Sequence, residues 1–122
     1  MFKNKKNIFF LGIGGIGMSA LARYFIAQGF NVGGYDKTKT VLTTKLEEEG
    51  AQVHYVDNVD SIQNSFLSKK DTLVVRTPAV PVDHKEWIYF QKEGFDILKR
   101  SQILGVITES NPSIAISGTH GK

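Results

Sequence analysis

The sequence predicts a single α/β domain in which helices cover both faces of a parallel β-sheet. Short apolar runs at 8–11 and 72–76 have the composition of strands that are buried on both faces. A glycine also ends a helix-like stretch and precedes a strand-like stretch three times, at Gly29, Gly50 and Gly94. Repeated helix-to-strand returns of this kind favour βα units, which bury their apolar faces in a parallel sheet.

Composition indicates one ordinary soluble domain. The chain has 122 residues, of which 41% are hydrophobic and 22% charged. It contains no cysteine, which excludes disulfide scaffolds and thiol nucleophiles and agrees with the cytoplasmic location that we expect. The net charge is +3, but the basic residues are dispersed, apart from a group that we interpret as a solvated tail: Lys3, Lys5 and Lys6. We therefore expect no nucleic-acid partner, and the run at 8–11 is too short for a signal sequence or membrane span.

The first half of the chain predicts a strand, a glycine turn, a helix and a second strand. The first strand is expected over 8–11, where glycines end the apolar run. Apolar residues then recur at the spacing i, i+3, i+4, i+7 and i+8, which places them on one face of a helix. These residues are Met18, Leu21, Ala22, Phe25 and Ile26, and the helix is expected to end before Gly29. The second strand is expected over 31–35, and another helix follows the polar segment 37–40.

The second half predicts a further strand over 72–76. Pro78 and Pro81 follow it and exclude both a helix and a central strand, so a loop is expected at the carboxyl end of the strand. Asp83 and Glu86 resemble a capping box at the start of a helix that contains Trp87 and Phe90. One more helix is expected over 101–108.

A polar segment at 110–112 predicts a domain boundary. On this prediction, 1–110 form the domain, and 111–122 form a linker and the start of a second domain that is absent here. The linker region includes a short expected strand at 114–116.

A glycine motif between the first strand and the first helix predicts a diphosphate-binding turn. The segment Gly12-Ile13-Gly14-Gly15-Ile16-Gly17 fits G-x-G-x-x-G. Glycines allow the backbone to approach a diphosphate, whose charge is met by free N–H groups and by the helix dipole. A purely structural tight turn is the alternative, but the flanking strand and helix favour the diphosphate site.

Asp36 follows the expected second strand, nineteen residues beyond Gly17. In dinucleotide-binding domains an acid at this place accepts hydrogen bonds from ribose hydroxyls. The alternative is a cap or turn aspartate at the start of the next helix, and the two roles are compatible.

The last residues resemble a Walker A loop, whose amides and lysine hold ATP phosphates: Gly118, Thr119, His120, Gly121 and Lys122. Ile116 stands where the first glycine of that motif belongs, and no Ser or Thr follows the lysine, so magnesium ligation is incomplete here. The three histidines His54, His84 and His120 lack the spacing of metal ligands, so no metal site is expected. We expect no catalytic residue in this chain.

The glycine turn and the Gly-Thr-His-Gly-Lys loop together resemble the Mur ligase family of peptidoglycan synthesis, over the whole chain. The resemblance implies a Rossmann-like domain that holds a UDP-sugar. By this resemblance, the residues expected to bind the UDP-sugar are Gly12, Gly14, Gly15, Ile16, Gly17, Met18, Asp36, Thr77, Pro78 and Ala79. Pro78 departs from the usual Ser-Ser-Ala of the family, and Val56-Asp57 replace a Gly-His pair that often follows the third strand.

Within the family, the segment at 12–22 is most similar to the ligase that joins L-alanine to UDP-N-acetylmuramate. The resemblance implies that the intact enzyme uses ATP and Mg²⁺, whereas this chain binds UDP-N-acetylmuramate without turnover and holds no cofactor tightly. Two alternatives stay open: the ligase that recycles a cell-wall tripeptide onto the same UDP-sugar, and an NAD-binding oxidoreductase domain. The oxidoreductase has no use for the Gly-Thr-His-Gly-Lys loop.

Overall fold

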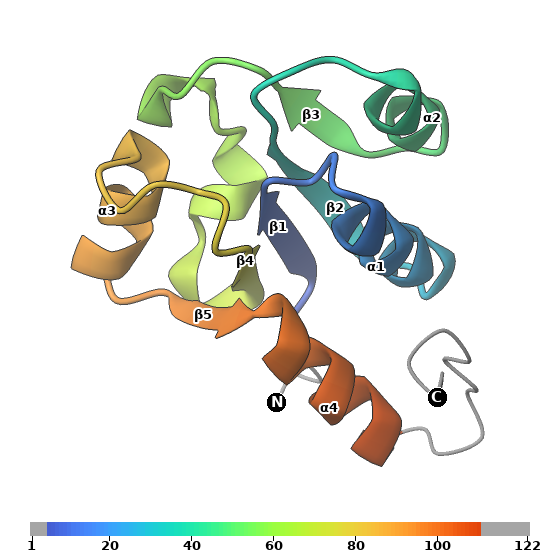
Figure 1. The fold of residues 1–122 in the computed structure, drawn as a ribbon. Coiled ribbons are helices and arrows are strands. Elements are labelled where there is room, and N and C mark those ends of the chain that lie inside the picture. Colours follow the sequence, from blue (N-terminus) through green and yellow to red (C-terminus); the bar gives the residue numbers. More distant parts are fainter. Residues whose placement is uncertain (1–4, 111–122) are drawn as a thin grey trace.

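The computed structural model describes residues 5–110, which form one five-stranded sheet. The strands lie in the order β3-β2-β1-β4-β5, and all four pairings are parallel (Figure 1). Their bounds are β1 Asn7–Leu11, β2 Asn31–Tyr35, β3 Gln52–His54, β4 Thr72–Arg76 and β5 Asp96–Lys99. The predicted fold class is confirmed.

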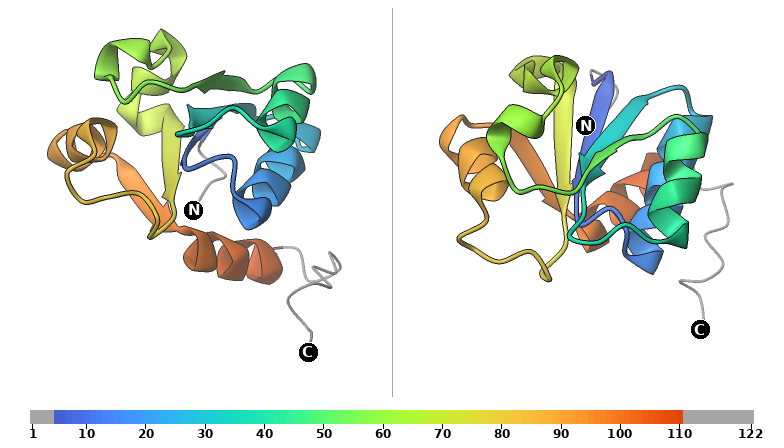
Figure 2. Two further views of the ribbon diagram at one scale, coloured as in Figure 1. Left: turned by 45° about the horizontal axis from the view of Figure 1, so that its top comes forward. Right: turned by 90° about the horizontal axis from the view of Figure 1, so that it is seen from above.

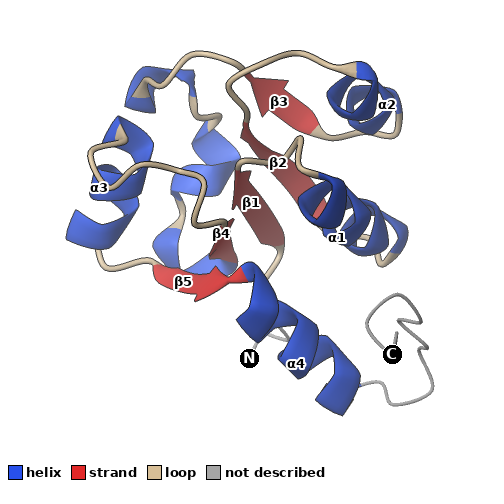
Figure 3. Cartoon of the chain, viewed as in Figure 1, coloured by secondary structure: helices blue, strands red, loops and turns tan. Residues whose placement is uncertain are grey.

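Helices cover both faces of the sheet, as predicted (Figure 2 and Figure 3). The helices α1, α2 and α4 lie on one face, and α3 lies on the other. Their bounds are α1 Ile16–Ala27, α2 Val41–Glu48, α3 Lys85–Lys92 and α4 Arg100–Ser110. The strand predicted at 114–116 and the loop at 118–122 lie outside the described residues.

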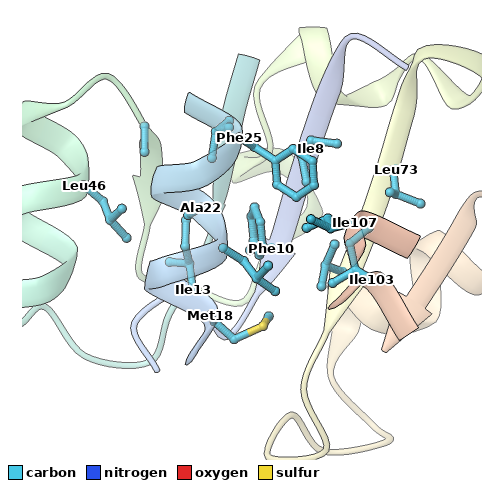
Figure 4. Packing of buried hydrophobic residues seen from close by; sticks show 14 residues of the cluster. Ile8, Phe10, Ile13, Met18, Ala22, Phe25, Leu46, Leu73, Ile103 and Ile107 are labelled. Carbon is cyan, nitrogen blue, oxygen red and sulfur yellow. The ribbon is translucent and has the colours of Figure 1, made fainter. Parts of the chain in front are cut away.

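The central strand β1 explains why the sheet has two cores. Ile8 and Phe10 point to the face of α1, α2 and α4, where they pack with Phe25 and Ile103 (Figure 4). The alternate residues of β1 pack on the opposite face with Phe66 and Phe90, among others. All five residues of β1 are buried, as the continuous apolar run predicts for a strand covered on both sides.

No element was predicted between β3 and β4, and three short 3₁₀ helices lie there. They are η2 Val59–Ser61, η3 Asn64–Leu67 and η4 Lys69–Asp71. Phe66 of η3 is fully buried, and its ring lies against Gly33 of β2. A Cβ atom on Gly33 would lie 2.7 Å from that ring, so the glycine makes room for the aromatic side chain.

The three predicted glycine stops are confirmed. Gly29, Gly50 and Gly94 have φ values of 91°, 115° and 80°, in the left-handed region that favours glycine. Each lies between a helix and the strand that follows it, so these three residues set the helix-to-strand returns of the fold.

The predicted capping box at the start of α3 is wrong. The residue that precedes the helix is His84, whose side chain makes no capping hydrogen bond. The carboxylate of Asp57 instead accepts hydrogen bonds from the backbone N–H of Lys85, at 3.0 Å, and of Glu86, at 3.1 Å. Because Asp57 satisfies these donors, Glu86 is free to turn inward, where its carboxylate is fully buried.

The interpretation of Lys5 as part of a solvated tail is also wrong. Its side chain is only 8% exposed, and its ammonium lies 2.6 Å from the Asp96 carboxylate at the start of β5. The ammonium also donates to the carbonyl of Lys70. The segment before β1 is therefore held against the sheet by an ion pair and a hydrogen bond.

Candidate functional site

The main cavity of the described residues lies where β1, β2 and β4 end. It has a volume of about 890 Å³, and its walls come from the segments that follow these strands and from the starts of α1, α3 and α4. The order of the strands reverses at β1, since β2 lies on one side of it and β4 on the other. Ligands of open α/β sheets bind at such a switch point, outside the carboxyl ends of the strands.

The glycine turn forms one wall of this cavity. Gly12 has a φ of 90°, and the N–H groups of Gly12 and Ile13 donate to the carbonyl of Tyr35. The turn leads directly into α1, whose N-cap residue is Gly15. No side chain caps this helix end, and its first turn contains no acidic residue. The positive end of the helix dipole therefore faces the cavity, and no side chain of the helix's own first turn neutralises it.

Asp36 holds the glycine turn in place. One carboxylate oxygen accepts from the N–H of Gly14 at 2.9 Å, and the other accepts from the N–H of Thr38 at 3.1 Å. The helix α2 is capped by Thr40 and Thr43, which form a reciprocal capping box. Asp36 is therefore a turn residue and not the helix cap, while its role toward a ribose stays a prediction.

Arg100, the first residue of α4, lies next to the glycine turn and also lines the cavity. A Cβ atom on Gly17 would lie 2.7 Å from the Cζ of the Arg100 guanidinium, so the missing side chain leaves room for the cation. No carboxylate within 5–110 lies at ion-pair distance from Arg100. A cation and a positive helix end thus lie close together, an arrangement that an anion between them would stabilise.

The part of the cavity away from the glycine turn carries charges of both signs. Asp57, Asp83 and Lys85 line it, and the carboxylate of Glu86 is fully buried. Burial raises the pKa of the Tyr35 hydroxyl, and the charges of Asp57, Glu86 and Asp36 raise it further. The Glu86 carboxylate accepts from His54 Nε2 at 2.7 Å and from the N–H of Asn58 at 3.1 Å. These contacts join β3, the segment after it and α3 into one wall.

Most of the substrate residues named from the sequence meet at this cavity. Seven of them line it: Gly12, Gly15, Gly17, Met18, Asp36, Thr77 and Ala79. Gly14, Ile16 and Pro78 do not: the amide of Gly14 is turned to Asp36, Ile16 is 83% exposed, and Pro78 is exposed. The ATP-loop residues Gly118 to Lys122 lie outside the described residues. The ligand roles of all these residues stay predictions.

Sequence reasoning did not name nine further residues of the cavity wall as site residues: Tyr35, Lys37, Asp57, Val80, Pro81, Asp83, His84, Lys85 and Arg100. Their positions at or after the carboxyl ends of the strands could have suggested them, because carboxyl ends of parallel strands meet at one edge of the sheet. Within 5–110, no three His, Asp or Glu side chains form a group that could hold a metal ion. No helix in that range is long and apolar enough to cross a bilayer.

The parallel sheet, the glycine turn and the cavity at the switch point define a Rossmann-like α/β domain. Residues 7–111 match the model of the Mur ligase family, catalytic domain. The chain belongs to this family.

Named relatives agree with this assignment. The chain is 56% identical over 115 residues to a UDP-N-acetylmuramate–L-alanine ligase of Parabacteroides distasonis, covering 94% of this chain and 25% of the relative. Among solved structures, it resembles the UDP-N-acetylmuramate–alanine ligase of Thermotoga maritima, with a TM-score of 0.76 and 29% identity over 86% of this chain and 23% of the other. A murein peptide ligase of Psychrobacter arcticus gives a TM-score of 0.70 and 25% identity, over 85% of this chain and 20% of the other. The chain spans about a quarter of the length of the curated relatives that it matches.

Proposed function

We propose that this chain is the part of an ATP-dependent ligase that holds UDP-N-acetylmuramate, and that the whole ligase joins L-alanine to this substrate. The observation that carries the proposal is the guanidinium of Arg100, which has no carboxylate partner among residues 5–110 and lies next to Gly17 at the uncapped start of α1. Backbone N–H groups, a helix dipole and a guanidinium together form a strong site for a diphosphate. The cavity volume also falls in the range of small-molecule sites.

The diphosphate would lie over the first turn of α1, along the segment 14–18. There the main-chain amides of Ile16, Gly17 and Met18 supply donors, and the exposed side chain of Ile16 does not need to contact the ligand. Thr77 and Ala79 would line the pocket beside the nucleotide, with Pro78 shaping the loop. Asp36 would position the turn and lie near the uridine.

In the intact ligase, ATP would transfer its γ-phosphoryl group to the lactyl carboxylate of UDP-N-acetylmuramate, which gives an acyl phosphate and ADP. The amine of L-alanine would then attack the acyl carbon, and phosphate would leave as the amide forms. The carboxylate alone is a poor acyl donor, so phosphorylation provides the leaving group. The segment Gly118 to Lys122 would belong to the ATP site, with Mg²⁺ offsetting the phosphate charge. This chain is expected to bind substrate without catalysing the reaction.

The comparisons favour the L-alanine ligase over the tripeptide-recycling ligase. The murein peptide ligase has nearly the same fold similarity as the L-alanine ligase of Thermotoga maritima, so the fold does not separate the two reactions. Relatives at 56% and 53% identity are L-alanine ligases, and among the solved structures the identity to the L-alanine ligase is 29%, against 25% to the murein peptide ligase. The absence of cysteine agrees with a reducing compartment, and we extend the proposal to a cytoplasmic location without a nucleic-acid or membrane partner.

Calorimetric titration of the 122-residue chain tests the proposal. UDP-N-acetylmuramate and UDP are expected to bind, whereas NAD is expected to give no saturable heat. Arg100→Ala is expected to weaken UDP binding about tenfold, because a charge-assisted contact to phosphate is lost. Lys92→Ala, at an exposed position of α3, is the matched control and should bind as the wild type does.

Three outcomes would contradict the proposal. NAD binding without a response to either UDP compound would favour the oxidoreductase alternative. An Arg100→Ala variant with unchanged UDP affinity would remove the observation that carries the diphosphate site. Failure of the folded wild-type chain to bind any of these ligands would contradict the claim that it holds the substrate by itself.

A further inference from the structure

His84 is a buried side chain in the wall of the cavity, and neither of its ring nitrogens has a hydrogen-bond partner among residues 5–110. The residue is 5% exposed, and it lies between the loop after β4 and the start of α3. Its Nδ1 lies 3.2 Å from an oxygen of Asp57, but no hydrogen bond joins the two atoms. Neither Nδ1 nor Nε2 has a partner within the described residues. A buried imidazole without partners costs folding free energy, and this cost has a functional explanation if a ligand supplies the partner.

The neighbours of His84 decide which part of a ligand it can meet. The carboxylate of Asp57 lies beside Nδ1, whereas the Asp36 carboxylate is held at the glycine turn by the N–H of Gly14, and Asp83, Lys37 and Lys85 also line the cavity. A phosphate group is repelled by the Asp57 carboxylate beside His84 and attracted to the Arg100 guanidinium beside the glycine turn. An uncharged part of the ligand therefore fits this end of the cavity.

Aromatic and apolar side chains form part of this end of the cavity. The ring of Tyr35 lies edge-on to the His84 ring, with centroids 4.5 Å apart. Val80 and Pro81 also line the cavity. Aromatic and apolar walls with a small number of polar groups are typical of small-molecule pockets. The nucleoside base is the part of a nucleoside diphosphate that matches this description.

We propose that His84, oriented by Asp57, makes the polar contact to the base of the nucleotide and thereby selects uracil. This inference rests on the proposed function, because it assumes a nucleoside diphosphate in the cavity. The Asp57 carboxylate, 3.2 Å from Nδ1, favours the tautomer with its proton on Nδ1, which leaves a lone pair on Nε2. The proposed contact requires the ring to turn so that Nε2 faces the cavity and accepts a hydrogen bond from the N3–H of uracil. Cytosine has an acceptor at this position and does not match.

Two substitutions separate the roles of the two ring nitrogens. Asn at position 84 retains an amide near the place of Nδ1, and Gln retains one near the place of Nε2. Binding of UDP, CDP and inorganic pyrophosphate is measured by calorimetry for the wild type, His84→Asn, His84→Gln and the control Lys92→Ala. Thermal unfolding establishes that each variant is folded.

The wild type is expected to prefer UDP to CDP. His84→Asn is expected to bind UDP about tenfold more weakly, to lose most of that preference and to bind pyrophosphate as the wild type does. His84→Gln should retain part of the preference. Unchanged UDP affinity in both variants, or an equal loss for UDP and pyrophosphate, would overturn the inference. Equal binding of UDP and CDP by the wild type would overturn it while leaving the diphosphate site intact, whereas a wild type that binds no UDP would contradict the proposed function itself.

Discussion

The guanidinium of Arg100 lies where a side chain on residue 17 would have to be. A Cβ atom at Gly17 would lie 2.7 Å from its Cζ and Nη2 atoms, although the two residues belong to the first and the last helix of the described chain. A glycine at the third position of G-x-G-x-x-G is usually explained by close packing of the helix on the sheet. Here it also leaves room for a cation at the pocket.

This relationship predicts that Gly17→Ala separates binding from stability. The methyl group should displace the guanidinium, which is the end of a flexible side chain, and should weaken UDP binding about tenfold. Alanine stabilises a helix by about 1 kcal/mol relative to glycine. This gain offsets the cost of moving the guanidinium, so the free energy of unfolding should change little. Calorimetry and urea denaturation measure the two effects. Tight UDP binding by a folded Gly17→Ala variant would contradict the role of Arg100.

Asp57 is predicted to stabilise α3 from outside the helix. Asp57→Ala removes the acceptor for the N–H groups of Lys85 and Glu86, and loss of such a cap should lower the free energy of unfolding by about 1 kcal/mol. Asp60→Ala is the matched control, since Asp60 is exposed and belongs to the same connecting segment. Chemical denaturation compares the two variants. An equal effect of both substitutions would contradict the capping role.

The contact between Gly33 and Phe66 predicts a steric cost. Gly33→Ala places a Cβ atom 2.7 Å from the buried Phe66 ring and 2.8 Å from the carbonyl oxygen of Gln52, and should destabilise the domain by about 2 kcal/mol. The loss should be smaller in a Phe66→Leu background, because the smaller side chain relieves part of the overlap. Gly105→Ala is the control: no atom lies within 4 Å of its added Cβ, so a stabilisation of about 0.5 kcal/mol is expected. Denaturation curves of the wild type, Gly33→Ala, Phe66→Leu and the double variant give the coupling energy.

Glu47 is predicted to make stability depend on pH. Hydrogen bonds from the Tyr55 hydroxyl and the Lys39 ammonium, at 2.8 and 3.0 Å, lower the pKa of its carboxyl group below the ordinary value of 4.5. A lowered folded-state pKa contributes stability that is present above the unfolded value and is lost as the pH falls through the folded value. Because the carboxylate is partly exposed, this contribution should be only about 0.5 kcal/mol.

Glu47→Gln should therefore be less stable than the wild type at neutral pH, and the difference should shrink as the pH falls below 4.5. The free energy of unfolding at a series of pH values checks this expectation. Glu48→Gln is the control, because Glu48 is an exposed neighbour on α2. A difference that is constant over this pH range would contradict the assignment.

The fold was largely predictable from local patterns. The apolar runs of β1 and β4 lie in the middle of the sheet, where burial on both faces leaves little choice of residue type. The helix ends at Gly29, Gly50 and Gly94 were predictable because left-handed backbone restricts the residue there. The segment of 3₁₀ helices at 59–71 was not, since it is too short and irregular to show a helical or strand period.

The candidate site was only half predictable, for a different reason. The glycine turn and Asp36 belong to one local motif. Arg100 and His84 are far from it in sequence, and they line the same cavity only because of the order in which the strands pair in the sheet. The error at the capping box has the same origin. Asp83, three residues before Glu86, fits the sequence pattern of a capping box. The helix is instead capped by Asp57, from the segment after β3, which accepts the hydrogen bonds of its first N–H groups.

The pairing of β1 with β4 also affects how the chain is made. Asn7 and Thr72 lie opposite each other in the sheet although they are 65 positions apart. While the ribosome has released only the first three strands, Phe9 is already present, but Phe66 and Phe90, which cover it in the finished domain, have not yet emerged. The nascent chain thus carries an open aromatic surface, which favours aggregation or chaperone binding. Synthesis of α3 is the event that ends this exposure.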